Sequence, residues 1–156
     1  GGLTAASQWR LTTSFTGDAA PIASNLEEVD TDEYGVLGSS MTESSGAFTF
    51  PSTGYWLVMF EANWAGTASS IYCEAQINST PNDSTWGIAV ANAGNLSYIS
   101  GSTHNVNATC SFIFDVSDTT QVKVRFTTNV ADNALTTLGG TAVSYTYMTF
   151  IRLGDT

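Results

Sequence analysis

The stretch GAFTFPSTGYWLVMF, residues 46–60, decides the fold of this 156-residue chain. Two apolar segments, residues 46–50 and 55–60, flank Pro51–Gly54, whose Pro, Ser and Gly are typical of a turn. In the segment 55–60, successive side chains point to opposite faces of a strand, and both faces are apolar. One face carries Trp56, Val58 and Phe60, and the other carries Tyr55, Leu57 and Met59. A strand of this kind needs a covering layer on each side.

The last apolar segment, residues 143–151, repeats this pattern of two apolar faces. In an antiparallel sandwich, the second covering layer is a loop or another subunit. We therefore expect an oligomer interface on these two strands, since their aromatic side chains offer large contact areas. Its expected members are Tyr55, Leu57, Met59, Tyr145 and Tyr147. The alternative is that these side chains belong to the core of a thick sandwich.

The composition indicates one β-rich domain with a single core, which suits the length of the chain. Charged residues make up 12% of the chain, so Ser, Thr and Asn, which favour strands and loops over helices, supply most of the polarity. Fourteen Asp and Glu against four Lys and Arg give a formal net charge of −10. This charge disfavours nucleic acid and anionic membranes as partners. No apolar run is long enough to cross a bilayer, so we expect no membrane insertion.

Short alternating segments separated by turn residues predict about nine or ten strands. The expected strands cover residues 8–15, 34–41, 46–50, 54–64, 69–78, 85–93, 96–100, 107–116, 120–128 and 142–153. No segment keeps the 3.6-residue apolar period of a helix. Residues 122–126 alternate most clearly, with Lys123 and Arg125 expected on a solvated face. Many short strands with Gly- and Asn-rich turns favour an antiparallel β-sandwich or a jelly roll.

The motif GAFTFPSTGY, residues 46–55, resembles a known family signature with a one-residue shift in register. The signature is G-x-F-x-x-P-x-x-G-x-Y, found in the complement C-one-q globular head and tumour necrosis factor superfamily. The segments TCSFIFDVSDTTQVKVRF and SYTYMTFIRL look like the strand–turn–strand unit and the aromatic closing strand of that family. This likeness spans roughly Gln8 to Leu153. The whole chain, with the segments RLTTSFTGDAAPI, EEVDTDEYGVLGSSMTESSG and FTFPSTG, is also similar to domains at the ends of marine phage tail and surface fibres.

This resemblance implies a ten-strand antiparallel jelly-roll β-sandwich that assembles as a homotrimer. It implies a non-catalytic receptor-binding domain of a phage tail or surface fibre, on the extracellular virion surface, with a host-surface receptor or glycan as partner. Residues 1–156 are then a single domain, the C-terminal piece of a longer fibre protein, and the N-terminus has no signal-peptide pattern. The alternatives are a purely structural trimerisation or decoration cap, and a carbohydrate-binding module of a secreted protein.

The long polar segment of residues 79–107 is the expected recognition surface. An aromatic side chain beside amide and carboxylate groups can stack on a sugar and hydrogen-bond to it, and binding residues often lie on loops held by a rigid scaffold. The candidates are Asn82, Asp83, Trp86, Tyr98 and His104. The alternative is that Trp86 belongs to the core and that the others lie in ordinary loops.

No constellation of residues predicts an enzyme. His104 lies near Ser102, but no nucleophile-elbow sequence surrounds the serine. Glu61 and Glu74 are candidates for the carboxylate pair of a glycosidase, although solvated strand faces explain them better. No glycine-rich phosphate loop joins a strand to a helix. We therefore expect no catalytic residues.

The remaining candidates are acidic residues and cysteines. The run EEVDTDE offers Asp30, Asp32 and Glu33 as calcium ligands, but its spacing does not match a calcium-binding loop, so a solvated loop and no cofactor are expected. Zinc would need about four ligands, and the chain has one His. Cys73 and Cys110 alternate with apolar neighbours, so both should face the core, either as free thiols or as one bridge between facing strands.

Overall fold

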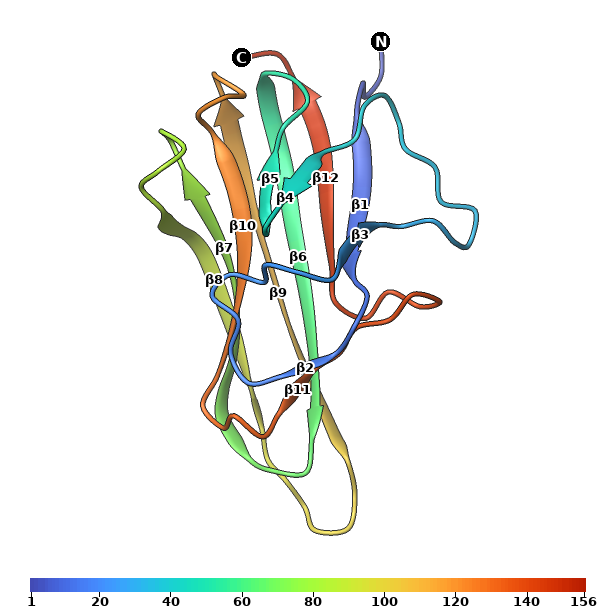
Figure 1. Cartoon of the computed structure of the whole chain (residues 1–156), viewed down its shortest axis with the longest axis vertical. Coiled ribbons are helices and arrows are strands. Elements are labelled where there is room, and N and C mark those ends of the chain that lie inside the picture. The colour runs from blue at the N-terminus through green and yellow to red at the C-terminus, as the bar shows by residue number, and fades with distance from the viewer.

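The chain forms two antiparallel β-sheets that pack face to face as a β-sandwich (Figure 1). The computed structural model describes all 156 residues. No helix in it has the length and apolar character needed to cross a membrane. The strands in chain order are β1 (Ala6–Leu11), β2 (Phe15–Thr16), β3 (Leu26–Glu28), β4 (Thr42–Ser44), β5 (Ala47–Thr49), β6 (Gly54–Gly66), β7 (Ser70–Thr80), β8 (Gly87–Leu96), β9 (His104–Val116), β10 (Lys123–Val130), β11 (Thr136–Thr137) and β12 (Tyr147–Gly154). The prediction of an all-β sandwich is confirmed.

The first sheet is built around β6. On one side β6 pairs with β9, and on the other side it pairs with β12, which is followed by β1 and β3. The far end of β6 also pairs with β11, and β11 pairs with β2. The second sheet has the order β4-β5-β10-β7-β8. The two sheets enclose the core between their inner faces.

The strand pairing is nested along the chain. β1 pairs with β12, β5 with β10, β6 with β9, and β7 with β8, so that each pair encloses the next. The pairing of β6 with β9 runs from Gly54 and Val116 to Gly66 and His104. Both chain termini lie at one end of the sandwich, and the loop between β8 and β9 lies at the other end (Figure 1).

Aromatic rings from both sheets form the centre of the core. The ring of Phe48 in β5 lies 5.3 Å from that of Trp9 and 5.2 Å from that of Phe150, both in the first sheet. It also lies 5.4 Å from the ring of Phe126 in its own sheet. The even-numbered residues 56–60 of β6 are buried beside these rings, as the alternation predicts. Each such burial contributes roughly 1.5–3 kcal/mol to folding.

The turn Pro51–Thr53 carries the chain from β5 in the second sheet to β6 in the first sheet. The indole Nε1–H of Trp56 donates to the carbonyl of Ser52 at 3.1 Å and holds this corner. Gly54 follows the turn at a φ of 134°, and a Cβ added there would lie 2.4 Å from the carbonyl oxygen of Gly154. The stretch that decides the fold therefore begins in one sheet and ends in the other.

The odd-numbered residues 55–59 of β6 lie on the outer face of the first sheet, away from the core. The alternative that they belong to the core of a thick sandwich is wrong, because Tyr55 is 42% exposed and the other two are only partly buried. Tyr147 shares this face, since it pairs with Glu61 of β6. Tyr145 does not, because β12 begins two residues after it and leaves it exposed in the preceding connection.

A loop after β3 covers the outer face beside β1. Arg10 of β1 points to that side and is completely buried beneath the loop. Its guanidinium forms ion pairs of 2.9 Å with both Glu27 and Asp30. Further along the loop, the hydroxyl of Tyr34 accepts a hydrogen bond of 3.0 Å from the backbone N–H of Gln8. The loop thus supplies the second layer over β1 and leaves β6 and β9 uncovered.

Two predicted strands are wrong. Residues 34–41 form a loop with a single bridge from Leu37 to Ala6, because Gly38 at a φ of 66° interrupts the extended chain. Residues 97–100 belong to the loop between β8 and β9. Conversely, β2, β3, β4 and β11 have only two or three residues each, too few for an alternating pattern. These short strands bring the total to twelve.

Candidate functional site

The outer face of the first sheet carries an exposed apolar surface, which we call the outer patch. Its members are Tyr55, Leu57 and Met59 of β6, Ile113 of β9, and Tyr147 and Ile151 of β12. Leu57 lies at the centre, because it pairs with Ile113 on one side and with Ile151 on the other. Ile113 is 56% exposed. Contiguous exposed apolar groups of this kind mark interaction surfaces.

The outer patch ends at a polar cluster around Glu61. The carboxylate of Glu61 accepts a hydrogen bond of 3.0 Å from Asn107 Nδ2 and another from Thr109 Oγ1. Nearby, the carbonyl of Tyr145 accepts a hydrogen bond from Asn63 Nδ2. Four of the five predicted interface residues therefore lie in the outer patch, and Tyr145 lies next to its polar boundary.

The residues predicted to recognise a receptor fall into two groups. Asn82, Asp83 and Trp86 precede β8 at one end of the sandwich. Tyr98 and His104 follow β8 at the opposite end. The ten residues of β8 span about 33 Å of extended chain. A ligand of the size of one sugar cannot contact both groups.

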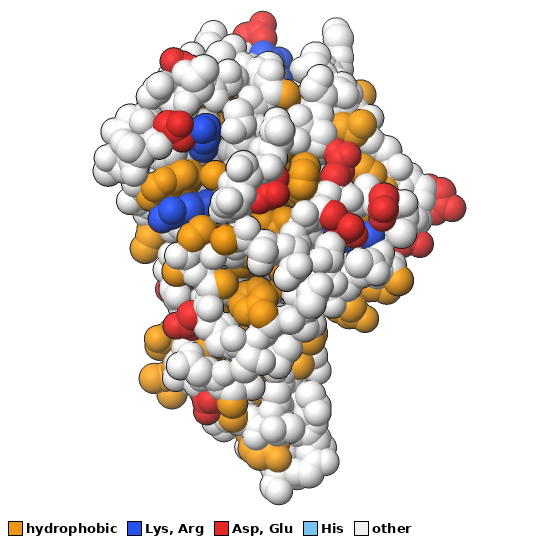
Figure 2. Space-filling view, viewed as in Figure 1, with side chains coloured by type: hydrophobic (Ala, Val, Ile, Leu, Met, Phe, Trp, Pro, Cys, Tyr) orange, Lys and Arg blue, Asp and Glu red, His pale blue; other side chains and the backbone are white.

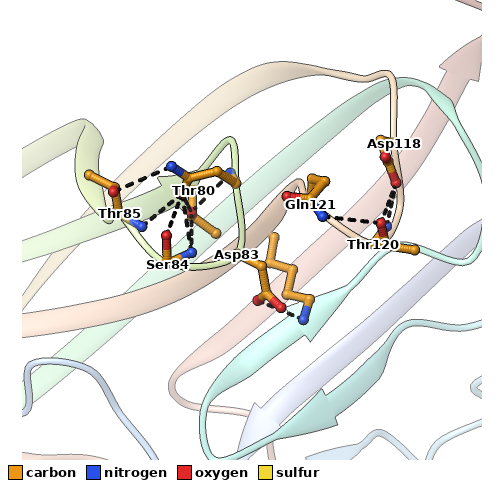
Figure 3. A network of polar contacts seen from close by, with 9 residues as sticks. Thr80, Asp83, Ser84, Thr85, Asp118, Thr120 and Gln121 are labelled. Atoms are coloured by element: carbon orange, nitrogen blue, oxygen red, sulfur yellow. Dashed lines mark hydrogen bonds and ion pairs between the residues drawn. The ribbon is translucent and has the colours of Figure 1, made fainter.

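Asn82 and Asp83 organise their own loop (Figure 3). Asn82 Oδ1 accepts hydrogen bonds from the backbone N–H groups of Ser84 at 3.1 Å and Thr85 at 2.8 Å. The carboxylate of Asp83 forms an ion pair of 2.7 Å with Lys123 of β10. The backbone N–H of Asp83 also donates to the loop that precedes β10. These contacts tie two neighbouring loops together and use the polar groups expected to meet a ligand.

At the opposite end, Tyr98 and His104 order the loop between β8 and β9. Their rings pack edge to face with centroids 5.8 Å apart. His104 Nε2 accepts a hydrogen bond of 3.3 Å from the backbone N–H of Ile99. The imidazole is therefore engaged with its own loop and is not paired with Ser102.

The acidic residues do not gather into a site. Glu61 lies on the outer face of the first sheet and Glu74 on that of the second, so their carboxylates cannot flank one glycosidic bond. Asp30 is exposed and pairs with the buried guanidinium of Arg10, and Asp32 and Glu33 are exposed as well. No group of three or more His, Cys, Asp or Glu side chains is arranged to hold a metal ion. Asp30, Asp32 and Glu33 therefore do not form a set of calcium ligands in this structure.

Cys73 and Cys110 are buried free thiols, which confirms the first of the two alternatives. Burial raises the pKa of both thiols, because desolvation disfavours the thiolate, and the pKa of Cys110 reaches about 11. Cys110 Sγ donates to the carbonyl of Ala75 at 3.7 Å. Thiols in this state are structural and not nucleophilic.

We expect Cys110 to make the folded state less stable at high pH. Its pKa rises from 9.0 to about 11 on folding, so the unfolded chain loses the proton first. The stabilisation is complete below pH 9 and is lost as the pH rises through about 11. Urea unfolding should show the unaltered chain losing up to about 2–3 kcal/mol relative to Cys110→Ala over this window. A difference in free energy that stays constant with pH would contradict this assignment.

A groove that the sequence did not predict lies on the outer face of the second sheet. Its walls are Trp86–Ile88 at the start of β8 and Ala20 in the segment after β2, and its volume is about 230 Å³. Its floor consists of the side chains of Gln76, Asn78, Arg125, Thr127 and Asn129 from β7 and β10. Figure 2 shows blue cationic side chains beside orange hydrophobic ones over this region of β10, β7 and β8.

The floor of the groove is a continuous chain of hydrogen bonds. Thr127 Oγ1 donates to Asn78 Oδ1 at 2.6 Å, and Asn78 Nδ2 donates to Gln76 Oε1 at 3.2 Å. The chain ends at Glu74, whose Oε1 accepts from Gln76 Nε2 and from Asn129 Nδ2. Because each amide is fixed by its neighbours, these polar groups are held in position before any ligand arrives.

Comparison of the chain with family models finds no match, and comparison with curated proteins finds no match either. What the protein does is therefore inferred from its own two surfaces, the outer patch and the groove.

Proposed function

We propose that the chain is a non-catalytic, trimeric adhesion domain of a viral fibre that recognises a molecule on the host surface. The nested pairing of β1–β12, β5–β10, β6–β9 and β7–β8 supports a jelly roll, because it divides eight strands between two sheets in that order. The strands β3 and β4 add one outer strand to each sheet, which gives ten. β2 and β11 are two-residue additions to this plan.

The outer patch is the observation that supports the trimer. Apolar surface in water is unfavourable by about 25 cal/mol per Å², and neighbouring copies of the chain would cover it. A closed ring of three uses a heterologous contact, in which the patch of one chain meets a different surface of the next. The edge strand β9 offers such a surface, since Phe112 is 40% exposed there.

The recognition role is supported by the likeness to fibre-end domains and by the groove with its aromatic wall. A recognition role implies a domain on the virion surface, with a receptor or glycan of the host cell as partner. The groove also suits a second candidate, a carbohydrate-binding module of a secreted protein, for which we expect a monomer. Specific adsorption of the isolated domain to host cells would separate a receptor-binding domain from a purely structural cap.

Light scattering over a dilution series tests the proposal. We expect a mass of three times the 16.5 kDa of one chain, and we expect this mass to persist on dilution, because the outer patch is buried only in the assembly. A stable monomer at every concentration would contradict the trimer and favour the carbohydrate-binding module.

A further inference from the structure

Arg125 is the one Lys or Arg side chain without an ionic partner. The chain has four cationic side chains, and three of them, at positions 10, 123 and 152, form ion pairs with carboxylates. Arg125 forms none, although acidic residues outnumber basic ones by fourteen to four. Its Nε is buried and has no hydrogen-bond partner. A buried N–H of a charged group that stays unsatisfied is costly, so this position suits an external acceptor.

Trp86 holds Arg125 at one end of the groove. The guanidinium carbon lies 4.3 Å from the centroid of the indole ring, in a cation–π contact. On the floor, Arg125 pairs across the strands with Asn78. The N–H donors of a guanidinium lie in its own plane, so stacking on the ring leaves them available to a ligand.

The groove is polarised along its length. Glu74 lies beyond the lining residues of the groove, four residues from Asn78 on β7 and about 13 Å away along the strand, and it forms no ion pair with Arg125. Its Oε1 accepts hydrogen bonds from two side-chain amides. At the Arg125 end, the carboxylate of Asp83 is held by Lys123. The groove therefore has a cation at one end and amides in the middle, and the nearest carboxylate of β7 lies past its other end.

We propose that this groove binds one residue of an acidic saccharide, with its carboxylate or sulfate group on Arg125. A guanidinium binds such planar or tetrahedral anions through charge-assisted, often paired hydrogen bonds. Gln76 and Asn78 each keep one N–H and one lone pair that the floor does not use, which suits sugar hydroxyls. The volume of about 230 Å³ lies below the roughly 300–1,000 Å³ of pockets for drug-sized ligands, so one sugar residue fits and a long segment does not.

Titration of the intact domain with three small sugars tests the proposal. The probes are sodium glucuronate, glucose 6-sulfate and uncharged glucose, and the readouts are calorimetry and the NMR signals of the Trp86 indole N–H and the Arg125 Nε–H. We expect at least one anionic sugar to shift both signals and to bind at least about tenfold more tightly than glucose. The two anionic probes distinguish a carboxylate from a sulfate ligand. Equal binding of all three, or binding of none, would overturn the proposal.

Two variants of β10 distinguish binding to Arg125 in the groove from a general effect of positive charge on sugar binding. Arg125→Gln should weaken the anionic sugar by at least about tenfold, because it removes the guanidinium. Lys123→Gln is the matched control, since it makes the same charge change on the same face of the same strand; because it also releases Asp83 from its ion pair, it should weaken binding slightly, by less than about fivefold. Equal weakening by both variants would overturn the proposal. Thermal melting shows whether Arg125→Gln folds. If it does not, the titration of the unaltered domain decides whether the groove prefers an anionic sugar.

This inference adds a ligand class to the proposed adhesion function and rests on that function for its biological meaning. The experiments can nevertheless contradict the sugar site and the trimer independently. A mass of three chains without sugar binding would overturn the groove and leave the trimer. A monomer that binds an anionic sugar in this groove would overturn the trimer and leave the groove.

Discussion

Leu57→Glu should convert an assembly of three chains into single chains. Leu57 lies between Ile113 and Ile151 at the centre of the outer patch, so a neighbouring copy would bury the new carboxylate without a partner. An unpaired buried charge costs several kcal/mol, which is enough to separate subunits of an ordinary interface. In the single chain the same side chain faces solvent, so the fold should persist. Light scattering measures the mass, and thermal melting monitored by circular dichroism checks the fold.

Ile71→Glu is the matched control for this change. It introduces the same carboxylate in place of an apolar side chain of β7 that is 85% exposed and lies outside the outer patch. We expect this variant to keep the mass of three chains. If Leu57→Glu also keeps that mass, the outer patch is not the interface.

Glu27→Gln combined with Asp30→Asn should destabilise the fold by about 3 kcal/mol. The two substitutions leave the guanidinium of Arg10 fully buried with no counter-charge. Breaking a buried ion pair in this way costs about 3–5 kcal/mol, and the lower end applies because Asp30 is 74% exposed and its charge is screened. For a chain of this length, we expect a melting temperature lower by about 6–12 °C.

Arg10→Met should lower the free energy of unfolding by less than the removal of the two carboxylates does. It places an apolar side chain under the loop, and the carboxylates of Glu27 and Asp30 can regain water, since they are 32% and 74% exposed. Urea unfolding of both variants gives the comparison. A larger loss of stability from Arg10→Met would show that the packing of its side chain, and not its charge, holds the loop against β1.

Alternation along single strands could be predicted from the sequence. The two faces of β6 and the direction of Arg125 away from the core follow from period-two patterns and are confirmed, but Arg125 is half-buried in the groove and does not lie on the open, solvated face that the pattern predicted. The short strands β3 and β11 could not be predicted, because they exist only where a neighbouring strand offers free backbone groups. The buried position of Arg10 was also beyond prediction, since it depends on how the loop after β3 folds back over β1.

The groove shows why the recognition site was only partly predicted. Trp86 was singled out as an aromatic side chain among polar ones, but its partner Arg125 lies far along the chain. The alternation of residues 122–126 indicated an ordinary solvated face. Only the pairing of β7 with β10, and the position of Trp86 beside them, turns these side chains into one lined cavity. Tyr98 was grouped with Trp86 because both lie in one polar segment, and β8 places them far apart.

The nested pairing makes β12 a requirement for completing the fold. Ala6 pairs with Ile151, so the first sheet joins its halves only after residues 6–151 have all been synthesised. Until β12 arrives, β6 lacks one neighbour and exposes an unpaired edge, which favours aggregation. Contacts between such distant segments also form slowly. A polypeptide that stops before Tyr147 therefore cannot complete the first sheet, and the folded population is restricted to chains that contain β12.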